Sequence, residues 1–232
     1  MDLTSFYEVI TGRIPPVTFS EAWFLENIKN QSHPIYEKIR LVIDFILGLI
    51  MFIIFSVSFP LTALAIKLSS PGPIFIKQKR VGQWNREFTI YKYRSMYYDP
   101  VDNTANSSNW MFTKKSDIRI TSIGKFLRQT RLDELPQCLN ILKREITLIG
   151  PRPEMKEVFE VMKEKMPYYP LRHIVKPGMT GWAVIHQNYT DNWDTTLQKL
   201  QYDIFYIKNR SLLLDLFIIL RTINVVVRMK GQ

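Results

Sequence analysis

The chain has 232 residues, enough for one well-buried domain with an appendage. Its 31 Lys and Arg residues against 21 Asp and Glu give a net charge of +10, which favours an anionic partner such as a nucleic acid, a phospholipid surface or a phosphorylated substrate. The single cysteine, Cys138, excludes an intrachain disulfide, and three scattered histidines leave little material for a zinc site or a histidine-based triad.

Residues 1–35 precede the first long apolar run and form a connector segment. Pro15 and Pro16 interrupt this segment, and Ser20 followed by apolar residues predicts a short helix capped by Ser20. No residue pattern in the segment indicates a function.

Residues 36–67 contain an uncharged apolar run of 22 residues, Phe45 to Ile66, which exceeds the usual length of a membrane-spanning helix. Pro60 lies inside this run and predicts a break near Ser58, because proline removes a backbone hydrogen bond and clashes with the preceding turn. The limb before the break would rise only about 22 Å, short of a hydrocarbon core of about 30 Å.

Basic residues flank the apolar run on both sides, with Lys38 and Arg40 before it and Lys67, Lys77, Lys79 and Arg80 after it. Both flanks therefore carry the mark of the cytoplasmic side, which favours a re-entrant helix over a spanning one. A buried core helix of a soluble protein is the third reading, and it is weaker because few core helices are apolar on every face. We expect Asp44, at the apolar boundary, to pair with Lys38 or Arg40 at the membrane interface.

Two alternating stretches follow, residues 74–81 and 88–94, and the turn residues 82–85 between them predict a hairpin. The polar, Asn-rich residues 99–110 predict a mobile loop. A short helix is then expected over residues 121–130.

An adjacent acidic pair, Asp133 and Glu134, stands just before Pro136. Proline is best tolerated in the first turn of a helix, so a helix starting at Leu135 with Asp133 as its N-cap is predicted. A helix N-terminus keeps nearby carboxylates ionised and attracts phosphate, and ionised carboxylates serve as nucleophiles or metal ligands. The alternative is that the pair only caps the helix.

Most of the excess basic charge lies close to this pair, since residues 67–131 hold 13 Lys and Arg against 4 Asp and Glu. Guanidinium groups match phosphate oxygens, which makes five side chains candidates for gripping a diphosphate: Lys92, Arg94, Arg128, Arg131 and Arg152. The alternative is a basic face that is merely solvated. Further along, residues 176–182 form a constrained loop of the kind that carries binding residues, with Lys176 and Thr180 as candidates. The apolar stretch 212–227, interrupted by Asp215, Arg221 and Asn224, is either a membrane-surface helix or a core helix.

The ordered set of motifs resembles the bacterial sugar transferase family, also called monotopic phosphoglycosyl transferases, over about residue 36 to the C-terminus. The resemblance rests on these motifs: Lys38-x-Arg40-x-x-x-Asp44, Ser70-Pro71-Gly72-Pro73, Gln78-Lys79-Arg80-Val81-Gly82, Tyr91-Lys92-Tyr93-Arg94, Arg131-Leu132-Asp133-Glu134-Leu135-Pro136-Gln137, Gly150-Pro151-Arg152-Pro153, Lys176-Pro177-Gly178-Met179-Thr180-Gly181-Trp182 and Tyr202-Asp203-x-x-Tyr206.

The resemblance implies a mixed α/β, mostly helical fold: one compact catalytic domain over residues 68–232, a re-entrant membrane helix over residues 36–67 broken near Pro60, and surface amphipathic helices. It implies location at the cytoplasmic face of the bacterial inner membrane, as a monotopic protein. The implied partners are a UDP-sugar donor, undecaprenyl phosphate as acceptor and membrane phospholipid, with a homodimer left open.

The implied reaction transfers a sugar-1-phosphate from a UDP-sugar to undecaprenyl phosphate and releases UMP, as the first step of polysaccharide or glycoconjugate synthesis. Asp133 would be the nucleophile that carries the phosphosugar, and Glu134, with Asp133, would hold Mg²⁺. The implied substrate ligands include Lys92, Arg128 and Arg152 beside Pro151. After Ala183 this chain reads Val184-Ile185-His186-Gln187-Asn188 where the family commonly has Gln-Val-Asn-Gly-Arg, so donor preference cannot be transferred from relatives.

Two other classes of function are weighed against this one. A non-catalytic membrane-bound scaffold or regulator of glycan assembly has no physical need for both acids together with Lys92, Arg128 and Arg152. A membrane-associated nucleic-acid binder would need stacking aromatics or a recognition helix, and neither pattern is found, so we expect no nucleic-acid partner.

Overall fold

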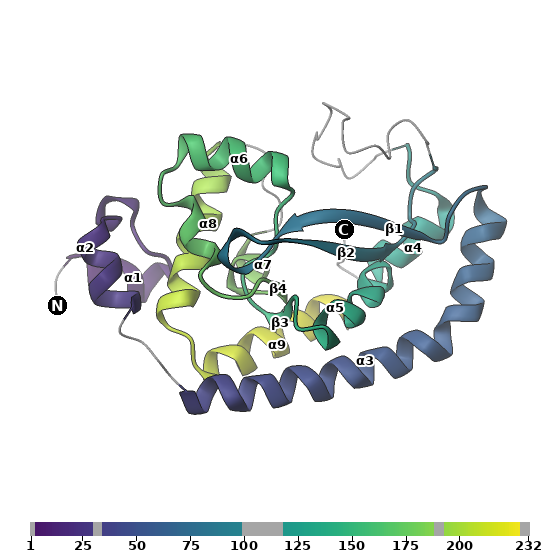
Figure 1. Ribbon diagram of the computed structural model, residues 1–232, viewed down its shortest axis with the longest axis horizontal. Helices are drawn as coiled ribbons and strands as arrows, with labels where there is room; N and C mark the ends of the chain where they lie inside the picture. The colour runs from purple at the N-terminus through teal and green to yellow at the C-terminus, as the bar shows by residue number, and fades with distance from the viewer. Residues whose placement is uncertain (1–2, 30–33, 99–117, 188–192, 228–232) are drawn as a thin grey trace.

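The computed structural model describes residues 3–29, 34–98, 118–187 and 193–227. The fold is mostly helical, with two small two-stranded sheets and one long apolar helix near the N-terminus, as the sequence predicted (Figure 1). The predicted mobile loop over residues 99–110 lies outside the described residues.

The helices and strands are α1 (Leu3–Thr11), α2 (Glu21–Phe24), α3 (Pro34–Ser69), β1 (Phe75–Val81), β2 (Glu87–Tyr93), α4 (Ser122–Gln129), the 3₁₀ helix η4 (Leu132–Gln137), α5 (Cys138–Leu142), β3 (Thr147–Ile149), α6 (Lys156–Lys165), the 3₁₀ helix η5 (Tyr169–His173), β4 (Gly178–Thr180), α7 (Trp182–His186), α8 (Trp193–Lys208) and α9 (Leu212–Val227).

Helix α3 contains the whole apolar run and remains a single helix of 36 residues with Pro60 inside it. The predicted break near Pro60 is therefore wrong. Proline removes only one backbone donor, and a helix can absorb this loss by bending. Figure 1 shows α3 running along the lower edge of the molecule and turning upward in its C-terminal part. Nearby, the Ser58 hydroxyl donates to the carbonyl of Ile54 at 2.7 Å, a back-bond that often accompanies a bend.

The first half of α3 is fastened to the rest of the chain by polar contacts with β3. Arg40 is only 6% exposed and donates to the Thr147 hydroxyl at 2.6 Å and to the carbonyl of Ile149. Asp44 accepts from the backbone N–H of Leu148 at 3.0 Å. The expected ion pair of Asp44 with Lys38 or Arg40 is not formed among the described residues: the backbone donor on β3 satisfies the carboxylate, and Arg40 acts on Asp44 only through its charge.

The C-terminal half of α3 packs against the hairpin through aromatic rings. Phe59 stacks on Phe75 at a centroid distance of 5.7 Å, and Phe75 stacks on Tyr93 at 5.4 Å. Ile66, Tyr93 and Leu127 form the small buried cluster at this end. Both halves of α3 thus contact one and the same folded domain.

The predicted hairpin is confirmed, with β1 and β2 antiparallel from Phe75 opposite Tyr93 to Val81 opposite Glu87. Trp84 and Asn85 in the turn have positive φ values of 57° and 58°. In β2, Ile90 and Tyr93 are buried, and β2 packs against η4. The predicted helix after the loop is also confirmed: Thr121 caps α4 by accepting from the backbone N–H of Gly124 at 2.9 Å.

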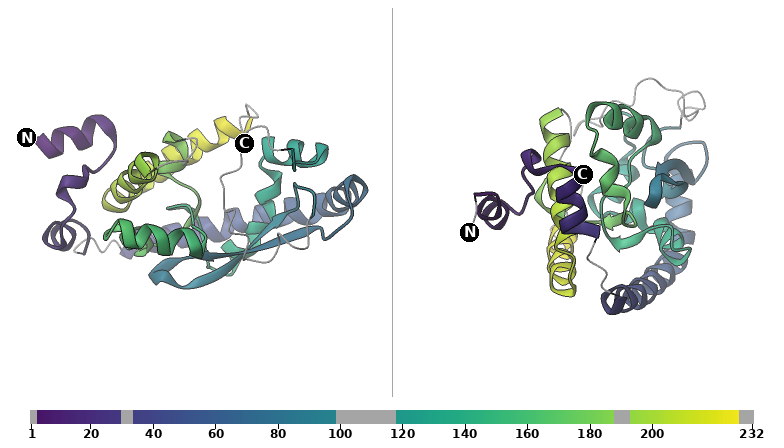
Figure 2. Two further views of the ribbon diagram at one scale, coloured as in Figure 1. Left: turned by 90° about the horizontal axis from the view of Figure 1, so that it is seen from above. Right: turned by 60° about the vertical axis from the view of Figure 1, so that its left-hand side comes forward.

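The main core lies between β3, α6, η5, α8 and α9. Ile14 from the N-terminal segment is 1% exposed within this core, so the connector packs on the domain, and Figure 2 shows the N-terminal helices (purple) beside α8. The hydroxyls of Tyr36 and Tyr206 both donate to Asp215, each at 2.8 Å, which joins α3, α8 and α9. Helix α9 is partly a core helix, because Ile218 is fully buried while Leu213 is 80% exposed; its location at a membrane surface stays a prediction.

Candidate active site

The acidic pair lies in the first turn of η4, the 3₁₀ helix that leads into α5. Arg131 is the N-cap residue of η4 and has a left-handed backbone with φ 60°. The prediction that Asp133 is the N-cap of a helix starting at Leu135 is therefore wrong. The positive φ of Arg131 turns the chain one residue before Leu132, so both acids fall inside the helical turn. Asp133 and Glu134 are 9% and 5% exposed.

One carboxylate oxygen of Glu134 binds two cations that come from distant parts of the sequence. Its Oε1 atom accepts from Lys92 Nζ at 3.1 Å and from an Arg152 amino group at 2.5 Å. Burial by itself would raise the pKa of Glu134, but the charges of Arg152 and Lys92 hold it well below its usual value. Glu134 is therefore a permanent anion whose charge is already compensated.

Asp133 lies beside Glu134 in a different environment. Its Oδ1 atom is buried and has no hydrogen-bond partner within the described part of the chain. Burial and the adjacent Glu134 charge raise the pKa of Asp133 to about 6, against the opposing charges of Lys92, Arg128 and Arg131. The sequence suggested that the helix start keeps both acids ionised. The structure instead raises the pKa of Asp133 and lowers that of Glu134. A capping role is also contradicted, because the N-cap of η4 makes no side-chain capping bond.

Three further arginines place positive charge close to the pair. Arg128 donates through Nε to the Ser95 hydroxyl at 3.0 Å, and its charge and that of Arg131 act on Asp133. Arg80 was not among the predicted substrate-binding residues, but it lies close enough to Glu134 and Arg152 to interact with their charges. Its Nε atom is buried without a partner among the described residues, and burial lowers the pKa of its guanidinium. Its place in the Gln78–Gly82 motif was the signal that could have found it.

The turn that carries Arg152 is held by a buried charged cluster behind it. Arg172, from η5, donates to the Arg152 carbonyl at 2.9 Å. The same guanidinium pairs with Asp203 at 2.7 Å and with Glu154 at 3.2 Å, and Lys199 also pairs with Glu154. Arg172 belongs to none of the motifs identified in the sequence. The only sequence signal for the cluster was Asp203 in the Tyr202-Asp203-x-x-Tyr206 motif.

The structure brings Asp133, Glu134, Lys92, Arg128, Arg131 and Arg152 together, but four other candidates lie elsewhere. Arg94 is 3% exposed and donates to the carbonyls of Pro71 at 2.6 Å and Ser70 at 2.7 Å, so it closes the end of α3 instead of facing the acids.

The remaining candidates support the backbone or line another pocket. The carbonyl of Pro151 accepts from the Gly178 N–H at 2.9 Å, and the Thr180 hydroxyl bonds to that of Thr222 at 2.8 Å. Lys176 lines a separate pocket beside α3.

The acidic pair supplies two carboxylates to this site. No group of three or more His, Cys, Asp or Glu side chains suited to a metal is present among the residues that the structure describes. Magnesium in phosphate chemistry is commonly bound by one or two carboxylates, with substrate phosphates and waters completing its shell. The unpartnered Asp133 oxygen and the neighbouring Glu134 fit such a site.

Several known proteins with similar sequences are named as transferases of sugar phosphates to undecaprenyl phosphate. One relative, 42% identical over 193 residues, is a UDP-N-acetylgalactosamine-undecaprenyl-phosphate N-acetylgalactosaminephosphotransferase of Aeromonas hydrophila; the match covers 83% of this chain and 44% of that protein. Another, 35% identical over 182 residues, is a UDP-glucose:undecaprenyl-phosphate glucose-1-phosphate transferase of Escherichia coli, with 78% of this chain and 38% of that protein covered. An exopolysaccharide production protein of Rhizobium leguminosarum is 39% identical over 166 residues, which are 69% of this chain and 81% of that protein.

The chain thus spans less than half the length of the first two relatives. The sequence pattern of bacterial sugar transferases matches residues 35–229, which include α3, the acidic pair and the cations around it. The chain belongs to the bacterial sugar transferase family.

Proposed function

We propose that this protein transfers a sugar-1-phosphate from a UDP-sugar to undecaprenyl phosphate through a covalent intermediate on Asp133. The observation that carries the proposal is the unequal acidic pair: Glu134 is compensated by two cations, whereas Asp133 keeps a buried oxygen with no partner among the described residues. The names of the relatives support the reaction type. A non-catalytic scaffold has no need for a buried carboxylate oxygen that lacks a hydrogen-bond partner.

In the first proposed step, a carboxylate oxygen of Asp133 forms a bond to the sugar-linked phosphorus of the donor. The bond from that phosphorus to the bridging oxygen breaks, and UMP leaves with the electron pair. In the second step, a phosphate oxygen of undecaprenyl phosphate attacks the same phosphorus and restores the Asp133 carboxylate. A covalent nucleophile divides one transfer into two easier steps, and UMP can leave before the lipid reacts.

The cations of the site would stabilise the negative charge that spreads over the phosphoryl oxygens during both steps. Arg128, Arg131 and Arg80 lie beside the acids and are not ion-paired with them, so they are suited to bind the diphosphate. Lys92 and Arg152 hold Glu134 in place. We propose Mg²⁺ as the cofactor, held by Glu134 and Asp133; when bound, it would neutralise charge on the donor phosphates.

We further propose that the protein is monotopic at the cytoplasmic face of the bacterial inner membrane. Within the described residues, α3 is the one helix long and apolar enough to cross a membrane. Its outward side chains are largely exposed, including Phe45 at 55%, Ile53 at 55% and Val57 at 78%. An apolar face of this extent is typical of a surface that contacts lipid or another protein.

The contacts of α3 support a helix that enters the membrane and returns. Arg40 and Asp44 bind β3 at one end, and Phe59 packs on Phe75 at the other, so both ends contact one domain. A spanning helix would carry its ends to opposite sides of the bilayer, and a polar domain could not follow it. Basic flanks on both sides agree with this orientation.

The test is UMP release by the purified chain in nanodiscs with undecaprenyl phosphate, a panel of UDP-sugars and Mg²⁺, with and without a chelator. We expect release with at least one sugar, and loss of release together with loss of a covalently labelled protein in Asp133→Asn. Lys163→Gln, an exposed residue of α6, is the control for handling effects. Labelled protein or wild-type turnover in Asp133→Asn would disprove the nucleophile assignment.

A further inference from the structure

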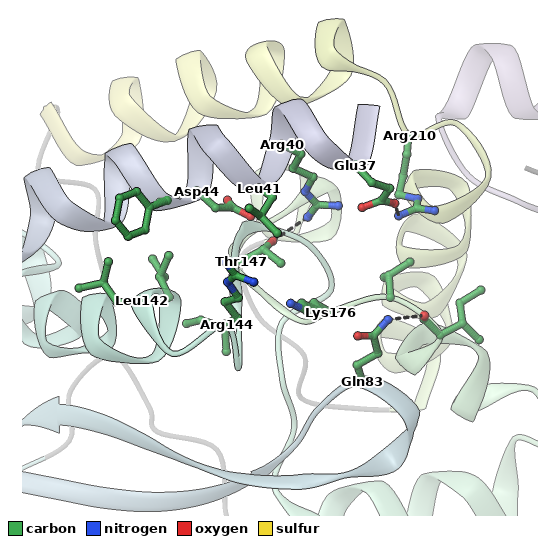
Figure 3. A pocket seen from close by; sticks show the side chains of 15 residues that line it. Glu37, Arg40, Leu41, Asp44, Gln83, Leu142, Arg144, Thr147, Lys176 and Arg210 are labelled. Carbon is green, nitrogen blue, oxygen red and sulfur yellow. Dashed lines mark hydrogen bonds and ion pairs between the residues drawn. The ribbon is translucent and has the colours of Figure 1, made fainter. Parts of the chain in front are cut away.

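A second pocket lies between the first half of α3 and the segments that lead into β3 and β4 (Figure 3). Its volume is about 270 Å³, and its charged lining residues are Glu37, Arg40, Asp44, Arg144, Lys176 and Arg210. None of the acidic pair, Lys92 or Arg152 lines it, so this pocket is separate from the candidate active site.

Most of the charges in this pocket already have partners. Arg210 pairs with Glu37 at 2.6 Å, Arg40 donates to Thr147, and Asp44 accepts from the Leu148 N–H. These contacts leave two cations to be accounted for.

Arg144 and Lys176 are these two cations. Neither side chain makes a hydrogen bond or ion pair with any residue that the structure describes, and Figure 3 shows their charged ends pointing toward one another. Burial lowers the pKa of Lys176, and the charge of Arg144 lowers it further, which shows that the two cations are close neighbours. Glu37 and Asp44 line the same pocket and their charges act on Lys176, but four cations against two carboxylates leave the pocket with an excess of positive charge that an anion would stabilise.

The backbone of Arg144 supports a binding role. Its φ of 61° is in the left-handed region, which is uncommon for a residue other than glycine. The turn is kept by its own N–H, which donates to the Ile141 carbonyl at 2.9 Å. Strained positions of this kind cluster at ligand sites, and here the turn directs a guanidinium toward the pocket.

The α3 side of the pocket also carries apolar side chains, which adjoin the exposed apolar residues of the same helix. Leu41 and Phe45 of α3 line the pocket and are 42% and 55% exposed, respectively. Leu142 of α5 lines it as well. We propose that this pocket binds an anionic membrane phospholipid, with Arg144 and Lys176 holding its phosphate and the α3 wall contacting its acyl chains. The proposal rests on the proposed membrane location of the chain.

The proposal is tested by lipid binding to the full chain in detergent, measured by titration with dihexanoyl phosphatidylglycerol and, in separate arms, inorganic phosphate and farnesyl phosphate. The test variant is Arg144→Gln with Lys176→Gln. The control is Lys79→Gln with Lys163→Gln, which removes the same charge from exposed positions outside the pocket. Lys176→Arg keeps the charge and should bind like the wild type.

We expect the affinity for the phosphatidylglycerol to fall tenfold or more in the test variant and less than twofold in the control. Equal affinities in the two variants would overturn the site. Binding of inorganic phosphate or farnesyl phosphate as tight as that of the phospholipid would overturn the assignment of its occupant. UMP release with no phospholipid binding would overturn this inference alone and leave the proposed function standing.

Discussion

The strongest quantitative consequence of the site is that Asp133 destabilises the folded chain, so Asp133→Asn should be more stable than the wild type. The pKa of Asp133 rises from 3.8 to about 6 on folding, because burial and Glu134 disfavour its charge. One pKa unit corresponds to about 1.4 kcal/mol, which gives a cost of about 3 kcal/mol once the carboxylate is ionised. An asparagine carries no charge but needs hydrogen bonds of its own, so we expect a net gain of about 1 to 3 kcal/mol.

The size of the stabilisation depends on pH. Above about pH 6 the carboxylate is ionised in both the folded and the unfolded chain, so the wild type bears the full cost. Below about pH 4 it is protonated in both states, and the difference between variant and wild type should vanish. The gain should therefore appear as the pH rises from about 4 to about 6.

The assay is thermal unfolding in detergent with a chelator present, followed by the fluorescence of the 5 tryptophans. For a chain of this size each kcal/mol moves the Tm by about 2 to 4 °C, so we expect a rise of about 2 to 12 °C at pH 8. Asp194→Asn, at an exposed position in the first turn of α8, is the matched control and should not rise. A lower Tm for Asp133→Asn at pH 8, or a gain of the same size at pH 4, would refute the reasoning.

Three further substitutions test Glu134 and two residues that support the arginines of the site. Glu134→Gln should lower stability by about 2 to 4 kcal/mol at neutral pH, because it leaves Lys92 and Arg152 without their buried partner. This loss should shrink as the pH falls toward the lowered pKa of Glu134, and a pH-independent loss measured by denaturant unfolding would contradict it. Arg172→Lys should reduce UMP release at least tenfold and act mainly on kcat, because Arg172 positions Arg152. Unchanged kinetics would show that the buried cluster serves stability alone. Gly124→Ala should lower the Tm and UMP release together. A Cβ atom at this position would collide with the carbonyl of Ser95, whose hydroxyl accepts from Arg128. An unchanged Tm would contradict this packing.

Local sequence patterns determined the elements that depend on neighbouring residues. The alternation in residues 74–81 and 88–94 predicted β1 and β2, and Thr121 predicted the start of α4, because pleat and capping are set within a few residues. The apolar run predicted α3, although its continuity across Pro60 was missed. The break was expected from the lost backbone bond alone, whereas the packing of Phe59 on Phe75 and of Ile66 near Tyr93 holds the helix beyond Pro60.

The tertiary structure alone decided how equivalent residues divide their roles. The family resemblance implied different roles for Asp133 and Glu134, but their residue types and positions alone did not distinguish them. Only the fold brings Lys92 and Arg152 to Glu134 and leaves an oxygen of Asp133 unpartnered among the described residues. Arg94 and Arg152 were equal candidates for phosphate until Arg94 was found closing the end of α3. Charge is a property of the residue type, but its function depends on burial and on partners that lie far away in the chain. These are fixed only when the strands and helices pack.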